Sequence, residues 1–173
     1  MHVTECGVPA RSVLDRALVG NSDYHDSYSV RLSHPELGIV DIFYRIFAHV
    51  PFPAKALHVI RNKLASLIGL EAPTASEVLH VKIKDRHAVG DKIAVWPIFF
   101  LGESELVAGR DNKHMDFRLS VLKISDGDAI SVVVTTVCTI RNRFGKYYLR
   151  TIVPFHRRGL RRLLSNAVAA NRL

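Results

Sequence analysis

Cysteine is scarce in this sequence, and no hydrophobic run is long enough to cross a bilayer. Cys6 and Cys138 are the two cysteines in 173 residues, and because they form no CxxC pair, neither a disulfide framework nor a zinc site is expected. The longest uncharged runs, residues 93–102 and 129–140, fall well short of the ~20 residues that a membrane-spanning helix needs. The first residues also lack a basic segment followed by an apolar one, so no signal peptide is expected. These absences together predict a cytoplasmic protein.

Acidic residues are missing from the end of the chain. No Asp or Glu follows Asp128, and the formal net charge is +8. Such asymmetry can favour an anionic partner or membrane surface, although a solvated basic face is the alternative. The arginines proposed for such a contact are Arg157, Arg158, Arg161 and Arg162. Zinc-finger spacing, RNP-like aromatics and phosphate-binding loops are all absent, so no specific nucleic acid and no nucleotide cofactor is predicted.

The composition is that of a globular protein. Hydrophobic residues make up 48% of the sequence and charged residues 23%, which excludes a disordered chain. We expect one domain over residues 1–173, with residues 1–22 as an N-terminal extension that carries a short helix at about 10–18.

Hydrophobic periodicity predicts an ordered succession of elements. Residues 24–33 alternate as a half-buried strand, with Tyr24, Tyr28, Val30 and Leu32 on one side, and Asp26 is the exception to this alternation. Two apolar helices follow, at about 37–47 and 54–68. The remaining expected elements are strands at 78–83, 93–101, 105–109, 113–124, 129–141 and 146–153, and a terminal helix at 155–171.

This order of elements predicts an α+β fold. A strongly twisted antiparallel sheet tends to curl, and a long terminal helix can cover its open side. The order resembles the helix-grip fold of START domains, polyketide cyclases and birch-pollen-type allergens, in which a curved sheet grips a C-terminal helix. That resemblance implies an apolar cavity between the sheet and the helix.

A closer resemblance exists at specific segments. Residues 89–92 (VGDK), 114–118 (HMDFR), 142–148 (NRFGKYY) and 154–157 (PFHR) are similar to those of an uncharacterised bacterial domain-of-unknown-function family. Its members also occur as a C-terminal tail on some short-chain-dehydrogenase-like proteins. The resemblance implies a helix-grip-like fold but no established activity. An NAD(P) site is not expected, because no G-x-G-x-x-G follows a strand here.

The densest cluster of mixed charge lies at residues 113–124. On a strand, His114, Asp116 and Arg118 share one face. If that face lines a cavity, His114 and Asp116 could transfer protons while Arg118 holds an acidic group of a substrate. The alternative is an outer face on which Asp116 and Arg118 form cross-strand ion pairs. No paired ligand spacing indicates a metal site.

Further candidates come from the terminal helix and from the aromatic residues. His156 either acts as a second acid or base or caps the start of the terminal helix. Aromatic side chains that could line a ligand cavity or an ordinary core are Trp96, Phe99, Phe117 and Tyr148. The main hypothesis is therefore binding of a small apolar or aromatic molecule. The alternatives are a cyclase- or hydratase-type enzyme using His114 and Asp116, and an interaction module using the arginine-rich helix.

Overall fold

The computed structural model describes residues 2–14, 16–49, 87–127 and 129–173. The strands are β1 (Thr4–Glu5), β2 (Tyr24–Arg31), β3 (Lys92–Ile93), β4 (Trp96–Leu101), β5 (Glu105–Arg110), β6 (Met115–Asp126) and β7 (Ala129–Ile140). The helices of these ranges are α1 (Arg16–Gly20), α2 (Ile39–Phe47) and α5 (Arg143–Ala169). The helix predicted at 54–68 and the strand predicted at 78–83 lie outside the described residues.

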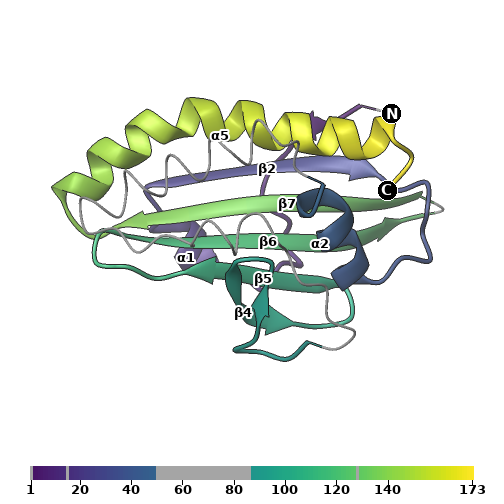
Figure 1. The fold of residues 1–173 in the computed structure, drawn as a ribbon, viewed down its shortest axis with the longest axis horizontal. Coiled ribbons are helices and arrows are strands. Elements are labelled where there is room, and N and C mark those ends of the chain that lie inside the picture. Colours follow the sequence, from purple (N-terminus) through teal and green to yellow (C-terminus); the bar gives the residue numbers. More distant parts are fainter. Residues whose placement is uncertain (1, 15, 50–86, 128) are drawn as a thin grey trace.

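The strands form a curved, unclosed antiparallel sheet, and α5 lies along it (Figure 1). The sheet has seven strands in the order β1-β2-β7-β6-β5-β4-β3. Both α2 and α5 contact it, α2 over β5 and β6 and α5 over β2 and β7. The predicted α+β class, with a curved antiparallel sheet and a long C-terminal helix, is confirmed and is consistent with a helix grip.

The C-terminal region differs from the prediction. The strand expected at 146–153 is wrong, because residues 143–169 form one continuous helix that contains Pro154. Proline has no backbone N–H to donate to the carbonyl of Arg150, but both residues are exposed, so water can bind that carbonyl. The buried positions Leu149, Leu160 and Leu164 recur at helical spacing on both sides of the proline.

The start of α5 is held closely against the start of β6. Asn142 is the N-cap, and its side chain accepts a hydrogen bond from the Gly145 amide at 3.0 Å. A side chain at Gly145 would not fit, because its Cβ would lie 2.2 Å from the carbonyl oxygen of His114. The cap and this glycine together fix where α5 leaves the sheet.

The two sides of the sheet have different cores. The side that faces α2 and α5 carries the main apolar core, which includes Ala108, Leu119 and Val134. The other side, here called the outer side, has a smaller cluster in which Leu14 of the N-terminal segment packs with Val107 and Val137.

A buried carboxylate attaches the N-terminal segment to the outer side. Glu105 is 3% exposed, and it accepts hydrogen bonds from Ser12 Oγ at 2.6 Å and from the Val13 amide at 2.8 Å. Ser120 Oγ donates to the same carboxylate at 2.5 Å. The expected N-terminal extension with a short helix is therefore packed on the sheet, with its helix at Arg16–Gly20 rather than 10–18.

Candidate ligand-binding site

A group of polar side chains lies between the sheet and the first half of α5. The carboxylate of Asp26 on β2 is 2% exposed. It accepts a hydrogen bond from the hydroxyl of Tyr24 at 2.6 Å, and Nε2 of His156 on α5 lies 3.4 Å from its other oxygen. The rings of Tyr24 and His156 meet edge to face at 6.1 Å. We call Tyr24, Asp26 and His156 the Asp26 cluster.

The electrostatics of this cluster keep Asp26 ionised and Tyr24 protonated. Burial by itself would raise the pKa of Asp26, but the hydrogen bonds from His156 and Tyr24 outweigh it and hold the pKa below its ordinary value of 3.8. Burial, together with the hydrogen bond and charge of Asp26, raises the pKa of Tyr24 well above its usual range. The site therefore contains a buried anion, the phenolic donor of Tyr24 and the imidazole of His156, and the Tyr28 hydroxyl also helps to lower the pKa of Asp26.

Two side chains of β7 complete the polar region beside this cluster. Thr136 is paired with Asp26 and Cys138 with Tyr24 in the register of β2 and β7. The Thr136 hydroxyl is buried and has no hydrogen-bond partner among the described residues. Burial, with smaller contributions from Asp26 and Asp23, raises the pKa of the Cys138 thiol to about 12, so this thiol stays protonated near neutrality. Thr136 consequently offers an unused donor and acceptor inside the domain.

An aromatic wall borders the same side of the sheet. Phe117 on β6 is paired with Cys138, and its ring centroid lies 6.1 Å from that of Trp96 on β4. The Trp96 ring in turn contacts Phe43 and Phe47 of α2 at 6.2 and 6.0 Å. Two of the aromatic residues predicted to bind a ligand, Trp96 and Phe117, therefore lie on the same side of the sheet as the Asp26 cluster.

The structure gives the predicted catalytic pair, His114 and Asp116, separate partners. Nδ1 of His114 lies 2.9 Å from Nδ2 of Asn142, and its ring packs on Phe144 at 4.7 Å. The Asp116 carboxylate accepts hydrogen bonds from Nε of Arg141 at 2.9 and 3.0 Å. His114 thus supports the start of α5, while Asp116 binds the end of β7. Their catalytic role stays a prediction.

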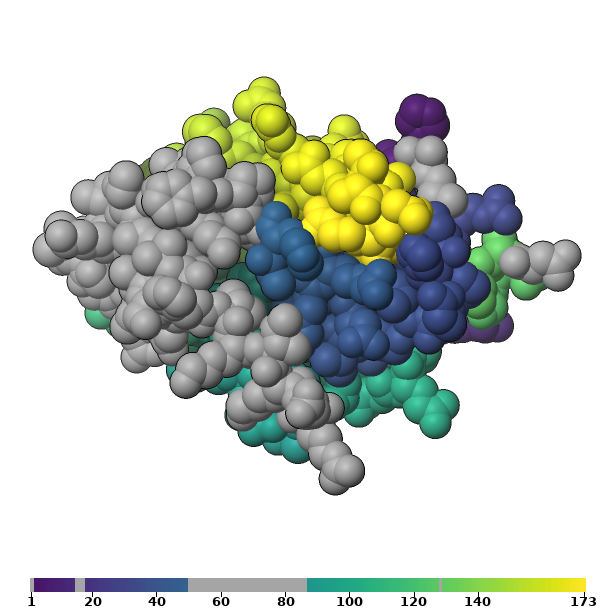
Figure 2. Space-filling model, turned by 45° about the vertical axis from the view of Figure 1, so that its right-hand side comes forward, coloured from purple at the N-terminus to yellow at the C-terminus, as the bar shows by residue number. Residues whose placement is uncertain are grey.

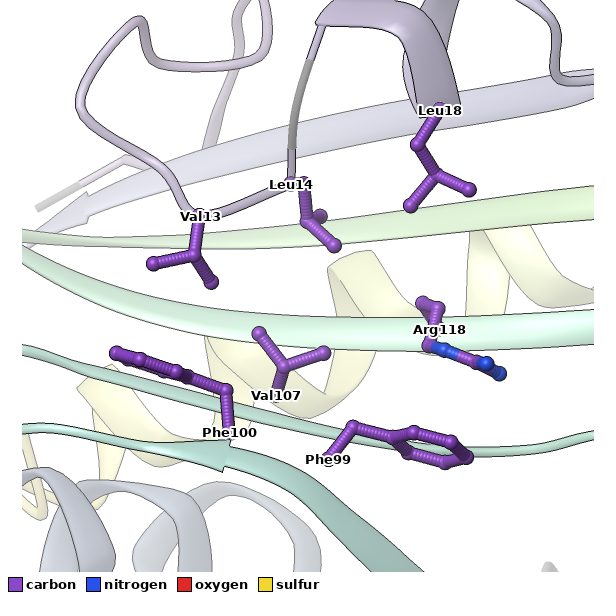
Figure 3. Close-up of a pocket in the computed structure, with 7 residues that line it drawn as sticks. All are labelled: Val13, Leu14, Leu18, Phe99, Phe100, Val107 and Arg118. Carbon is purple, nitrogen blue, oxygen red and sulfur yellow. The ribbon is translucent and has the colours of Figure 1, made fainter.

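Arg118 and Phe99 lie on the outer side of the sheet. Together with Leu14 and Val107 they line a hollow of about 240 Å³ (Figure 3), whose other lining residues are Val13, Leu18 and Phe100. Phe99 and Phe100 both face this hollow because the pairing of β4 with β5 shifts between Ile98 and Phe100, as a β-bulge does.

Arg118 is held in this hollow by local contacts. Its guanidinium donates to both oxygens of Asp111, at 2.5 and 3.1 Å, and lies 3.6 Å from the centre of the Phe99 ring. The structure therefore separates Arg118 and Phe99 from Trp96, Phe117 and His156. Tyr148, the remaining predicted ligand contact, is half-buried on α5.

Sequence reasoning identified His156 but missed its partners. Helix α5 begins at Arg143, so His156 lies in the middle of the helix and the predicted capping role is wrong. Its side chain instead points toward Asp26. The alternation at residues 24–33 predicts a strand, but by itself it indicates no function for Tyr24 or Asp26. The signal was present in the pattern, because Asp26 breaks the apolar alternation on the buried side of that strand.

Comparison with known proteins identifies the family of this chain. A family model described as "Protein of unknown function (DUF2867)" matches residues 18–163, which include the whole Asp26 cluster. No curated protein and no solved structure matches the chain. Among the helices that the structure describes, none combines the length and apolar character that crossing a membrane requires.

Proposed function

The chain belongs to the DUF2867 family, and we propose that its domain binds a small apolar or aromatic molecule between the sheet and the first half of α5. The Asp26 cluster supplies the polar end of the proposed site, and Phe117 and Trp96 supply its apolar wall. The observation that carries the proposal is the buried, ionised Asp26 beside the Thr136 hydroxyl, which has no hydrogen-bond partner among the described residues.

Burying a carboxylate and an unpaired hydroxyl costs free energy, so their presence in the interior calls for an explanation. An ionised carboxylate loses hydration on burial, and an unpartnered hydroxyl costs about 1–3 kcal/mol. Packing of the domain does not require them, because the same side of the sheet is apolar elsewhere. Perturbed titratable groups and unsatisfied polar atoms of this kind concentrate at binding and catalytic sites.

The chemistry of the site suggests which ligands it would accept. Ligand pockets are mostly apolar and contain a few polar groups that fix orientation. Asp26 can accept a hydrogen bond from a ligand hydroxyl, amide or ammonium group, and Thr136 can donate or accept one. The proposed ligand is therefore an aromatic or aliphatic molecule with at least one hydrogen-bond donor.

A ligand screen on matched variants tests this function. Thermal shift and native mass spectrometry would be run on the wild type with aromatic, acyl and polyketide-like compounds, both with and without a donor group. A binder should stabilise the wild type and the outer-side control Asp116→Asn, whereas Asp26→Asn should bind it at least tenfold more weakly. Absence of any binder across these classes, or equal binding by Asp26→Asn, would overturn the proposal.

A proton-transfer enzyme at the same site is the second candidate. The contact of His156 Nε2 with the Asp26 carboxylate favours it, because a buried carboxylate can orient an imidazole and stabilise its protonated form. The His156 side chain is 27% exposed, so it connects the buried anion with the surface. For a compound that is turned over, His156→Gln should abolish turnover and retain binding. Loss of turnover in His114→Gln but not in His156→Gln would instead support the catalytic pair predicted from the sequence.

A further inference from the structure

Along α5, arginines occur together with exposed aromatic rings. Tyr147 is 72% exposed, Phe155 64% and Phe144 37%. Exposed arginines lie between and beyond them on the same helix. We call this set the outer stripe of α5, and its members are Arg143, Phe144, Tyr147, Arg150, Phe155, Arg158 and Arg162.

Helical spacing places these residues within an arc of about 140°, which also contains Arg161, the partner of Glu5. At about 100° per residue, Arg143, Tyr147 and Arg158 project within about 60° of one another. The opposite face contains the buried positions Leu149 and Leu160. The outer stripe therefore follows most of a 27-residue helix, and Figure 2 shows the C-terminal half of that helix on the surface of the domain.

The arginines of α5 divide into two groups. Arg157 and Arg161 both form ion pairs with Glu5 of β1, so part of the positive charge predicted to meet a partner is used within the domain. The second group is Arg143, Arg150, Arg158 and Arg162, which have no ion pair with any described residue. The outer stripe is thus a positive surface that the rest of the described chain leaves uncompensated.

We propose that the outer stripe of α5 docks the domain on a bilayer surface that contains anionic phospholipids. Guanidinium groups bind phosphates in a bidentate manner, and clustered basic residues are attracted to anionic leaflets. Phenylalanine and tyrosine side chains beside these arginines can bury their rings at the boundary between headgroups and acyl chains. The exposed side of a helix is convex, so its arginines and rings can engage a flat surface together.

A nucleic acid fits the same surface less well. Proteins that bind single strands combine stacking rings with a positively charged groove that tracks the backbone, and the outer stripe is convex. A helix in the major groove of a duplex would contact phosphates through its arginines. The exposed rings of Phe144, Tyr147 and Phe155 would then have no base to stack on, because the bases of a duplex are already stacked on one another. A lipid surface uses both kinds of side chain.

Vesicle co-sedimentation with the full chain tests this proposal. Binding would be measured on phosphatidylcholine vesicles with and without phosphatidylserine, over a salt series. We expect binding to the anionic vesicles alone and weaker binding as salt rises. Each arginine contributes about fivefold to affinity, so Arg158→Gln/Arg162→Gln should bind about 30-fold more weakly. Tyr147→Ser/Phe155→Ser should also lose affinity while keeping the salt dependence.

A control of equal charge makes the result specific to this surface. Arg11→Gln/Arg31→Gln removes two exposed positive charges that do not lie on α5. This variant should bind within about twofold of the wild type, and circular dichroism would confirm that all variants fold. Equal binding to neutral vesicles, an equal loss in the control variant, or binding to duplex DNA but not to vesicles would each overturn the proposal.

Discussion

The layer between the sheet and α5 has two halves that differ in chemistry although the same strands and helix build both. In the half near α2, which we call the apolar half, Ile42, Phe43 and Leu164 are fully buried. In the half near the start of α5, here called the polar half, the sheet presents Asp26 and Thr136. The difference suggests that the apolar half carries the stability of the domain, which leaves the polar half available for binding.

The largest effect should come from the apolar half. Phe43 is 0% exposed, and its ring contacts Phe47 at 4.8 Å. Truncating a buried phenylalanine removes its transfer free energy and leaves a cavity, so Phe43→Ala should lower the free energy of unfolding by about 3–5 kcal/mol. Urea unfolding would measure it, with Phe43→Leu as a milder control. If Phe43→Ala lost less stability than Tyr24→Phe, the apolar half would not dominate the stability of the domain.

The next effect should come from the Asp26 cluster and should depend on pH. Tyr24→Phe removes a 2.6 Å hydrogen bond to the Asp26 carboxylate, and a hydrogen bond to a charged group contributes about 1.5–3 kcal/mol. The pKa of Asp26 is lowered in the fold, so its charge stabilises the fold above the ordinary pKa of 3.8. That contribution is lost as pH falls through the lowered value.

Unfolding of the wild type and of Tyr24→Phe at neutral and at acid pH measures this dependence. The difference between them should be full at pH 7 and should shrink as Asp26 becomes protonated. Tyr28→Phe should show a weaker form of the same pH dependence, because the Tyr28 hydroxyl also helps to lower the pKa of Asp26. A Tyr24→Phe effect that is equal at all pH values would show that the hydroxyl does not act through the Asp26 charge.

A smaller effect of opposite sign is expected at Thr136. Its hydroxyl is buried without a partner among the described residues, and Val replaces it with a methyl group of similar size. Thr136→Val should therefore raise the free energy of unfolding by about 1–2 kcal/mol. Ligand binding should weaken in the same variant. A destabilised Thr136→Val would mean that the hydroxyl already has a partner in solution, such as a bound water.

The sequence predicted the sheet well because strand alternation depends on local residue order. The strands predicted at 105–109, 113–124 and 129–141 appear within a few residues of their expected positions, since each buries alternate side chains against one core. The single strand predicted at 93–101 is wrong, because the chain turns at Ala94, whose φ is 52°, and divides into the antiparallel pair β3 and β4. The C-terminal region was predicted less well because Pro154 suggested a break. Whether a proline interrupts a helix depends on the exposure of the carbonyl four residues earlier, which is a property of tertiary structure.

The site was harder to predict because its members come together only in the fold. Asp26 and His156 are 130 residues apart, and no spacing rule connects them. By contrast, the cluster at 113–124 is conspicuous in the sequence because its charges are adjacent. Asp116 and Arg118 pair with Arg141 and Asp111, whereas the buried Nε2 of His114 has no hydrogen-bond partner among the described residues. Polar residues that interrupt a buried alternation, as Asp26 does, were the better guide to this domain.

The smallest predicted effect tests whether the two halves can move independently. Asn142 caps α5 next to the polar half, and an N-cap change to Ala costs about 1 kcal/mol. Asn142→Ala should therefore lose about that much stability, with faster hydrogen exchange confined to the first turns of α5. Amides of α2 and of the last turns of α5 should keep their wild-type rates. Asn142→Asp retains an acceptor for the Gly145 amide and should lose less. If exchange quickened equally along the whole of α5, the two halves would open as one unit, and the proposed division of roles between them would fail.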